Sequence, residues 1–216
     1  MRRQVALTSV MVALLAGMLA AGSHKHHRHA EQAAGGAAFK VLALSWAPNF
    51  CNDPSKKHSA TECGHHLGFV VHGLWPENAD GSPAATCSGG SPLGQDVVRQ
   101  LLNYIPDQGL IQHEWQTHGS CRFATGQEYA DAVKQAFTGL KVPGDYQAPG
   151  QDVHVAVNAI EGAFGSANGV AADDFRVSCH AGKLVNLEAC YTKDLKLMSC
   201  GGVRDCSGSV ELDAVK

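Results

Sequence analysis

Apolar residues in this chain fall into short runs separated by segments rich in glycine, proline and polar side chains. Residues 39–46, with the sequence FKVLALSW, form a continuous apolar run of the length of a buried strand. Residues 68–75 form a second run, in which Val70 and Val71 are β-branched, and Pro76 is expected to end that strand. Shorter runs predict three more strands, at residues 175–179, 183–191 and 195–200.

Other segments repeat apolar residues every three or four positions, which is the spacing of one face of a helix. This spacing predicts a helix over residues 96–105, and residues 110–118 and 151–164 are expected to form helices as well. Thr125 and Glu128 form a capping box, so a further helix is expected to begin there. Helices mixed with short strands, without a regular strand–helix–strand alternation, predict an α+β fold.

The N-terminal segment has the pattern of an export signal. Arg2 and Arg3 precede an apolar stretch at 5–21, and small residues close that stretch before Ser23. We therefore expect residues 1–22 to be a signal peptide that is removed. A membrane anchor is the alternative, but a stretch of about 17 residues is at the lower limit of spanning length.

The segment after the predicted cleavage site differs from the rest of the chain. Residues 23–38 include HKHHRH at positions 24–29 and show no apolar periodicity, so we predict a disordered linker. A metal-binding tail is the alternative interpretation of its histidines. A single domain, residues 39–216, is expected to follow, and its length suffices for a sizeable core.

Composition limits the function without identifying it. The hydrophobic fraction of 44% and the charged fraction of 17% are ordinary for a globular protein. The formal net charge is −3, whereas a protein that binds long duplexes through their phosphates is usually basic. Any interaction with a nucleic acid must therefore rest on a local site.

Cysteine usage agrees with export. All eight cysteines follow the predicted signal peptide, at positions 51, 63, 87, 121, 179, 190, 200 and 206. In an exported chain, eight cysteines predict four disulfides. The sequence alone does not determine which cysteines are joined. The chain has no Cys-x-x-Cys pair, which argues against a structural zinc site.

Two short motifs carry the candidate chemistry, residues 72–76 (HGLWP) and residues 113–121 (HEWQTHGSC). RNA carries its own nucleophile, the 2′-hydroxyl, so cleavage needs a base to remove that proton and an acid to protonate the departing 5′-oxygen. Imidazoles suit both roles because their pKa lies near working pH. Trp75 and Trp115 could stack on bases, although Trp115 by itself is more typical of a core residue.

Two other enzyme classes fit these motifs poorly. A zinc protease uses His-Glu-x-x-His, whereas this chain has His-Glu-x-x-x-His between His113 and His118. The extra residue spoils a shared zinc-binding face on an α-helix. A serine hydrolase needs a Gly-x-Ser-x-Gly elbow, which is missing, and Ser120 has no base partner by motif. Acid–base catalysis by two histidines therefore fits best.

With these motifs the chain resembles the ribonuclease T2 family. Residues 71–76 are similar to that family's first active-site segment, and residues 113–121 are similar to its second. Residues 41–46 with Cys51 resemble its opening strand, and residues 179–200 resemble its C-terminal pattern. The resemblance implies an α+β fold with a central antiparallel sheet flanked by helices. It also implies cleavage of single-stranded RNA through a 2′,3′-cyclic phosphate to 3′-phosphate ends, without a metal or another cofactor.

The resemblance assigns catalytic roles within both motifs. His118 would be the base and His72 the acid, and these roles would exchange in the second step. Glu114 would be the third catalytic residue, and it would bind or stabilise the phosphate together with His113.

The resemblance also assigns substrate contacts. Trp75 would form part of a base-stacking site, and Glu77 would contact a base. Thr117, also expected to contact substrate, departs from the family, which commonly has a lysine at this position. A threonine supplies only a hydroxyl, and charged hydrogen bonds are about twice as strong as neutral ones. We therefore expect a slower enzyme or one that recruits another cation.

A disulfide pairing is implied in the same way. The expected bonds are Cys51–Cys63, Cys87–Cys121, Cys179–Cys206 and Cys190–Cys200. The second bond would tie the loop after His72 to the end of the segment that carries His118, and would fix the two motifs relative to each other.

The expected function is that of a secreted or periplasmic endoribonuclease, a monomer that acts on single-stranded RNA and has no membrane contact after signal cleavage. The main alternative is a non-catalytic relative that binds RNA or a partner on the same fold. A histidine-rich metal-sequestering protein is a third hypothesis, which explains residues 24–29 but neither motif.

Overall fold

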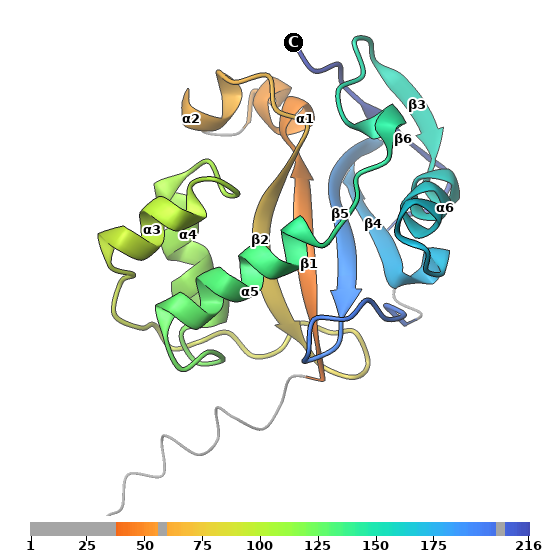
Figure 1. The fold of residues 1–216 in the computed structure, drawn as a ribbon. Helices are drawn as coiled ribbons and strands as arrows, with labels where there is room; N and C mark the ends of the chain where they lie inside the picture. Colours follow the sequence, from red (N-terminus) through yellow and green to blue (C-terminus); the bar gives the residue numbers. More distant parts are fainter. Residues whose placement is uncertain (1–37, 56–59, 202–205) are drawn as a thin grey trace, which may run out of the picture.

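The computed structural model of the chain describes residues 38–55, 60–201 and 206–216 (Figure 1). The predicted signal peptide, residues 1–22, and residues 23–37 of the predicted linker lie outside these ranges. Within the described ranges, no helix is long and apolar enough to cross a membrane.

The described strands form one six-stranded sheet in the order β2-β1-β5-β6-β3, with β4 also paired to β5. Every pair is antiparallel except β5 with β6, which pair in parallel through Lys183 and Glu211. The sheet is therefore mixed around an antiparallel centre, and the predicted α+β class is confirmed. The strands are β1 (Phe39–Trp46), β2 (Phe69–Glu77), β3 (Val153–Ala156), β4 (Phe175–His180), β5 (Lys183–Tyr191) and β6 (Ser209–Leu212).

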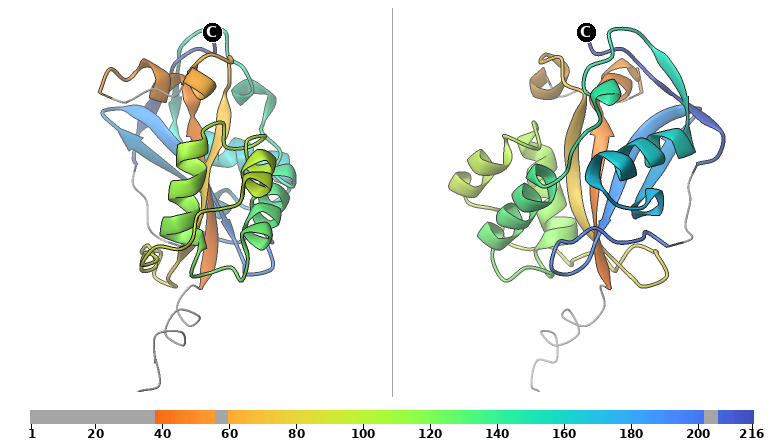
Figure 2. Two further views of the ribbon diagram at one scale, coloured as in Figure 1. Left: turned by 90° about the vertical axis from the view of Figure 1, so that its left-hand side faces the viewer. Right: turned by 45° about the vertical axis from the view of Figure 1, so that its right-hand side comes forward.

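Four of the α-helices lie in two groups beside the sheet, while α1 and α2 lie together at the end of β1 (Figure 1). Figure 2 shows α3, α4 and α5 gathered beside β2, and α6 beside β3 and β4. In Figure 1, α5 lies across β1 and β2, both of which it contacts. The helices are α1 (Ala47–Asn52), α2 (Ala60–Cys63), α3 (Gln95–Leu101), α4 (Gln108–Glu114), a π-helical turn (Trp115–Gly119), α5 (Gly126–Thr138) and α6 (Val157–Asn168), with 3-10 turns at Gly144–Tyr146 and Ala172–Asp174.

Strand β1 is buried on both faces, which explains its continuous apolar sequence. Leu42, Leu44 and Trp46 alternate onto the face that packs into the main core beneath the helices. Phe39 and Val41 alternate onto the opposite face, where a small cluster forms with Cys190 and Cys200. The second face also carries the polar side chains described below.

Strand β2 is longer than expected. Pro76 does not end it, because Pro76 pairs with Lys40 and the strand continues to Glu77. A proline is tolerated here because β2 is an edge strand, on which a missing N–H need not break an inner ladder.

The expected helix over residues 151–164 is wrong in its first part. Val153–Ala156 form strand β3, and α6 begins only at Val157. The cause is β6, which pairs antiparallel with β3 along its length and which was not predicted because it is so short. Alternating valines at 153 and 155 suit this pairing.

Two other expectations need correction. Residues 195–200 form no strand, because Leu195 has a φ of 56° and only an isolated bridge joins Leu197 to Tyr191. Helix α3 ends at Leu101 rather than continuing to residue 105. The capping prediction is confirmed, since the Thr125 side chain accepts a hydrogen bond from the Glu128 N–H at the start of α5.

The four disulfides join the expected cysteines: Cys51–Cys63, Cys87–Cys121, Cys179–Cys206 and Cys190–Cys200. Cys87 lies in the loop after β2, and Cys121 lies just after the π-helical turn. This bond is one of several contacts that attach the loop to α4 and the π-helical turn. The side chain of Gln112 accepts from the Leu93 N–H at 2.9 Å and donates to the Leu93 carbonyl at 3.0 Å.

Candidate active site

His72 lies at an irregularity in the pairing of β1 with β2. Ala43 pairs with Gly73 and the next residue, Leu44, pairs with Val71, so His72 is the extra residue of a bulge. A bulge changes the direction of a side chain relative to a regular strand. The His72 Nδ1 lies 3.1 Å from the Ser45 hydroxyl, and its Nε2 lies 3.5 Å from the Glu114 Oε1.

The second motif is helical, as expected, but it changes pitch. Helix α4 ends at Glu114 and the chain continues as a π-helical turn over Trp115–Gly119, closed by a 2.7 Å bond from the Ser120 N–H to the Trp115 carbonyl. π-Helical turns are often found at functional sites. Their five-residue hydrogen-bonded turn changes the angular step between His113 and His118 that a pure α-helix would impose. The Thr117 carbonyl accepts from the Cys87 N–H at 2.8 Å, which fastens this turn to the loop after β2.

Glu114 is the buried carboxylate of the site. It is 2% exposed, and the indole N–H of Trp75 donates to its Oε2 at 2.6 Å. Burial raises the pKa of Glu114 to about 7, although the Trp75 hydrogen bond acts in the opposite direction. Glu114 can therefore be either protonated or ionised near neutral pH.

Gly73 makes the close approach of Trp75 and Glu114 possible. A Cβ at this position would clash with the Glu114 Oε2 and would lie 2.6 Å from the Trp75 Nε1. The glycine of the first motif is therefore required by packing within the site, a role that was not assigned from the sequence.

The Trp75 ring lies next to both histidines with assigned acid–base roles. Its centroid is 5.2 Å from that of His72 and 5.9 Å from that of His118. Burial lowers the pKa of His118, and positive charge on His113 and His72 lowers it further. Burial also lowers the pKa of His72, while the Asn186 side chain raises it and charge on His113 lowers it. Three histidines and one carboxylate thus form a single electrostatic group.

The structure separates Glu77 from this group. Glu77 is buried, and its Oε1 accepts from the Arg176 Nη2 at 2.7 Å. The Arg176 Nε donates to the Glu188 Oε2 at 2.5 Å, so one guanidinium bridges two carboxylates. This is the arrangement of a structural ion pair, and contact of Glu77 with a base stays a prediction.

The other predicted positions have different surroundings. Trp115 is 8% exposed, donates to the Ser91 carbonyl at 2.9 Å and packs near Tyr129, so it is a core residue. Thr117 is partly buried, and its side chain carries a hydroxyl rather than a charge. Ser45 and Asn186 were not identified from the sequence, because each looks like an ordinary polar residue within a strand.

A pocket of about 280 Å³ opens beside His72. It lies between β2, the α1–α2 region and the start of α4, and its lining includes Ser45, Phe50, Glu62, Asp107 and His113. Burial, with a smaller contribution from the charge of Asp107, raises the pKa of Glu62 to about 7. The pocket therefore places an aromatic ring and polar groups next to the imidazole.

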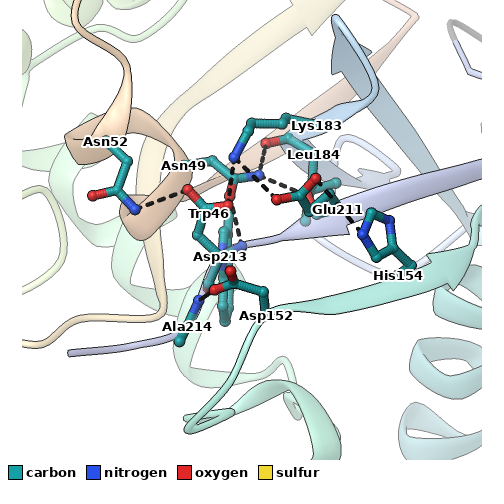
Figure 3. A network of polar contacts seen from close by, with 10 residues as sticks. All are labelled: Trp46, Asn49, Asn52, Asp152, His154, Lys183, Leu184, Glu211, Asp213 and Ala214. Atoms are coloured by element: carbon teal, nitrogen blue, oxygen red, sulfur yellow. Dashed lines mark hydrogen bonds and ion pairs between the residues drawn. The ribbon is translucent and has the colours of Figure 1, made fainter.

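A second polar cluster lies where β5, β6 and the segment before β3 meet (Figure 3). Asp152, Glu211 and Asp213 place carboxylate oxygens within 4.8 Å of one another, the one such group among the described residues. Lys183 already occupies it, 2.5 Å from the Asp213 Oδ1 and 3.3 Å from the Glu211 Oε1. Asn52 donates to the Asp213 Oδ2 at 2.8 Å. This cluster, the acidic network, therefore already holds a lysine between two of its three carboxylates, and we interpret it as a structural ion-pair network rather than as a metal site.

The chain matches the model of the ribonuclease T2 family over residues 37–200. It is 37% identical over 119 residues to a probable ribonuclease of Haemophilus influenzae, a match that covers 49% of this chain and 44% of that relative. It is 26% identical over 199 residues to ribonuclease DdI of Dictyostelium discoideum, covering 80% of this chain and 83% of the relative.

Among solved structures, trichomaglin, described as an S-like ribonuclease, superposes with a TM-score of 0.66 at 22% identity, covering 82% of this chain and 98% of that one. The structural likeness supports the fold, and the family model matches well over half of the sequence. The chain therefore belongs to the ribonuclease T2 family.

Proposed function

We propose that this chain is an endoribonuclease that cleaves single-stranded RNA with His72 and His118 as its acid–base pair. The observation that carries the proposal is the grouping of both imidazoles around the hydrogen-bonded Trp75–Glu114 pair. The alignment with the Haemophilus relative spans less than half of that protein's length, so the activity is proposed on the site and the family rather than transferred from that protein.

In the first step His118 removes the proton of the 2′-hydroxyl. The 2′-oxygen attacks the adjacent phosphorus, the bond from phosphorus to the 5′-oxygen breaks, and His72 donates its Nε2 proton to that oxygen. The products are a 2′,3′-cyclic phosphate and a free 5′-hydroxyl. In the second step the roles exchange. His72 accepts a proton from water as the water oxygen attacks phosphorus, the bond from phosphorus to the 2′-oxygen breaks, and His118 protonates that oxygen, which leaves a 3′-phosphate.

Glu114 and His113 would stabilise the charge that develops on the phosphate. A carboxyl whose pKa is raised to about 7 is partly protonated near neutral pH and can then donate a hydrogen bond to a phosphoryl oxygen. His113 adds a nearby imidazole that acts electrostatically on both His72 and His118. These groups supply donors without requiring a metal ion.

The same proposal includes the compartment and the substrate contacts. The four disulfides suit an oxidising environment, which supports a secreted or periplasmic protein. The Trp75 ring, next to both imidazoles, supports base stacking at the cleavage position. Action as a monomer stays a prediction.

Incubation of single-stranded RNA with the protein in excess chelator tests the proposal. We expect cleavage by the wild type and strong loss of cleavage with His72→Ala and with His118→Ala. Tyr104→Phe is a suitable control, since it removes one hydroxyl from an aromatic residue that packs edge-on against Phe137 of α5. Binding of RNA without cleavage by the wild type would instead support the non-catalytic alternative.

A further inference from the structure

His72, Ser45 and Asn186 form a row of polar side chains across three neighbouring strands. Ser45 of β1 pairs directly with Asn186 of β5, and His72 occupies the bulge of β2 on the other side of β1. The Ser45 hydroxyl lies 3.1 Å from the His72 Nδ1 and 3.0 Å from the Asn186 Oδ1. Because all three residues belong to the sheet, their positions are set by strand register rather than by loops.

The number of available hydrogens determines the direction of this row. A serine hydroxyl has one hydrogen to donate, and here it points to the Asn186 Oδ1. The Ser45 oxygen can then act toward His72 only as an acceptor, so the His72 Nδ1 must carry a hydrogen. The His72 Nε2, on the far side of the ring, faces Glu114 at 3.5 Å.

Building on the proposed function, we propose that Ser45 and Asn186 are positioning residues that hold His72 with its Nδ1 protonated, so that Nε2 is the nitrogen that exchanges the catalytic proton. The row serves both states of the ring. In the imidazolium, Nδ1–H donates to Ser45 and Nε2–H is available to the departing 5′-oxygen. After that transfer the Nδ1–H bond remains and Nε2 holds the lone pair that accepts a proton from water.

The charged surroundings of His72 make this support consequential. Glu114 faces Nε2 from α4, His113 acts on the ring from the same helix, and His118 lies across Trp75 on the π-helical turn. The adjoining pocket adds Glu62 and Asp107. Burial lowers the pKa of His72, and the Asn186 side chain opposes that change. Loss of the row should therefore lower the pKa of His72 and move the alkaline limb of the rate profile to lower pH.

Variants at Ser45 and Asn186 separate this role from a merely structural one. Ser45→Ala and Asn186→Leu remove acceptors, whereas Asn186→Asp strengthens the acceptor with a charge and should shift the titration of His72 in the opposite direction. Ser45→Thr keeps the hydroxyl and should behave like the wild type. Ser178→Ala is the matched control. Ser178 of β4 pairs with Asn186 of β5, and its buried hydroxyl has no hydrogen-bond partner among the described residues.

The decisive measurement is nitrogen-15 NMR of the His72 ring through a pH titration, alongside kcat and KM on an oligoribonucleotide. We expect a neutral ring protonated at Nδ1. In Ser45→Ala we expect a titration lowered by roughly half a pH unit or more and kcat reduced about three- to tenfold, which is the scale of one neutral hydrogen bond. KM should change little, and Ser178→Ala should leave the titration unchanged.

Two results would overturn the inference: a neutral His72 protonated at Nε2, or an unchanged titration in both Ser45→Ala and Asn186→Leu. The NMR measurement does not depend on activity. If the wild type did not cleave RNA, the proposed function would fail while the ring protonation would still decide the inference. If the wild type cleaved RNA but the titrations were unmoved, the positioning role alone would fail.

Discussion

Two clusters of this molecule, the acidic network and the histidine site around Glu114, bury a carboxylate against the same sheet. The pKa of the buried carboxylate is lowered in the first cluster and raised in the second. In the acidic network, burial raises the pKa of Asp213, but the hydrogen bonds from Lys183 and Asn52 outweigh it and hold that pKa below its usual range. In the histidine site, burial raises the pKa of Glu114 to about 7 and the indole of Trp75 only partly opposes it. The two pKa values move in opposite directions because Asp213 has the cation Lys183 beside it, whereas the donor to Glu114 is the uncharged indole of Trp75.

The comparison shows how to separate structural from reactive polar groups in this fold. Asp213 and Glu77 each form an ion pair with a neighbouring cation, Lys183 and Arg176 respectively. Glu114 has an uncharged indole donor and a histidine that can lose its charge. Groups left in this poised condition are candidates for catalysis, because small changes in their surroundings alter their protonation.

Removal of either acid–base histidine should have the largest effect. His118→Ala and His72→Ala should each lower kcat about 100- to 10,000-fold, the usual contribution of a positioned acid or base. Initial rates on single-stranded RNA, with folding checked by circular dichroism, measure this. Retention of more than a tenth of the wild-type kcat in either variant would remove that histidine from the mechanism.

Glu114→Gln should be the next most harmful change. The amide can still accept from Trp75 and can still donate through its NH2 group, but it cannot take the ionised form that faces the His72 Nε2 and favours protonation of that ring. We therefore expect kcat to fall about tenfold, the effect of roughly one pKa unit on the catalytic acid. Asp213→Asn is the matched change in the acidic network and should leave kcat per folded molecule near the wild-type value. Equal losses in the two variants would contradict the distinction drawn between the clusters.

Thr117→Lys should raise the rate. Because a charged hydrogen bond to the phosphate is stronger than a neutral one, we expect an increase in kcat of roughly three- to tenfold. Thr117→Met supplies a long uncharged side chain as a control. An unchanged or reduced rate with lysine would show that the site does not lack a cation.

The pH optimum should lie on the acid side of about 6.5, the ordinary pKa of histidine. Burial lowers the pKa of both His72 and His118, so the base becomes neutral at lower pH and the acid also loses its proton at lower pH. Both limbs of the bell-shaped profile then move toward acid. Values of kcat/KM measured from acidic to weakly alkaline pH test this shift. An optimum above neutral pH would contradict it.

Changes in the acidic network should affect stability rather than rate. Lys183→Met leaves the carboxylate of Asp213 without its cation, and because the lysine is partly exposed we expect a loss of about 1–2 kcal/mol in the free energy of unfolding. The pKa of Asp213 is depressed in the folded state, so this contribution is present above about pH 4 and is lost as the pH falls through the folded-state pKa. Urea unfolding at neutral and acidic pH should show the difference shrinking toward acid, with kcat unaffected.

The sequence was most informative about residues whose side-chain chemistry is required for their role, such as an acid–base histidine or a helix-capping threonine. His72, Glu114 and His118 lie in two motifs that the structure brings together, and Thr125 indicates the start of α5 correctly. Prediction from the sequence failed where pairing with a strand far along the chain determined the local structure. β3 was mistaken for helix because its partner β6 lies over 50 residues away along the chain. The role of Asn186 could not be predicted either, because it depends on the register of β5 against β1.

The most direct test of the central claim is phosphorus-31 NMR of an oligoribonucleotide of mixed sequence incubated with the wild-type protein in excess chelator. We predict that a 2′,3′-cyclic phosphate appears first and is then converted to a 3′-phosphate, and that neither signal develops with His118→Ala. Formation of 5′-phosphate ends, or the lack of any cleavage until a divalent metal is added, would contradict the account.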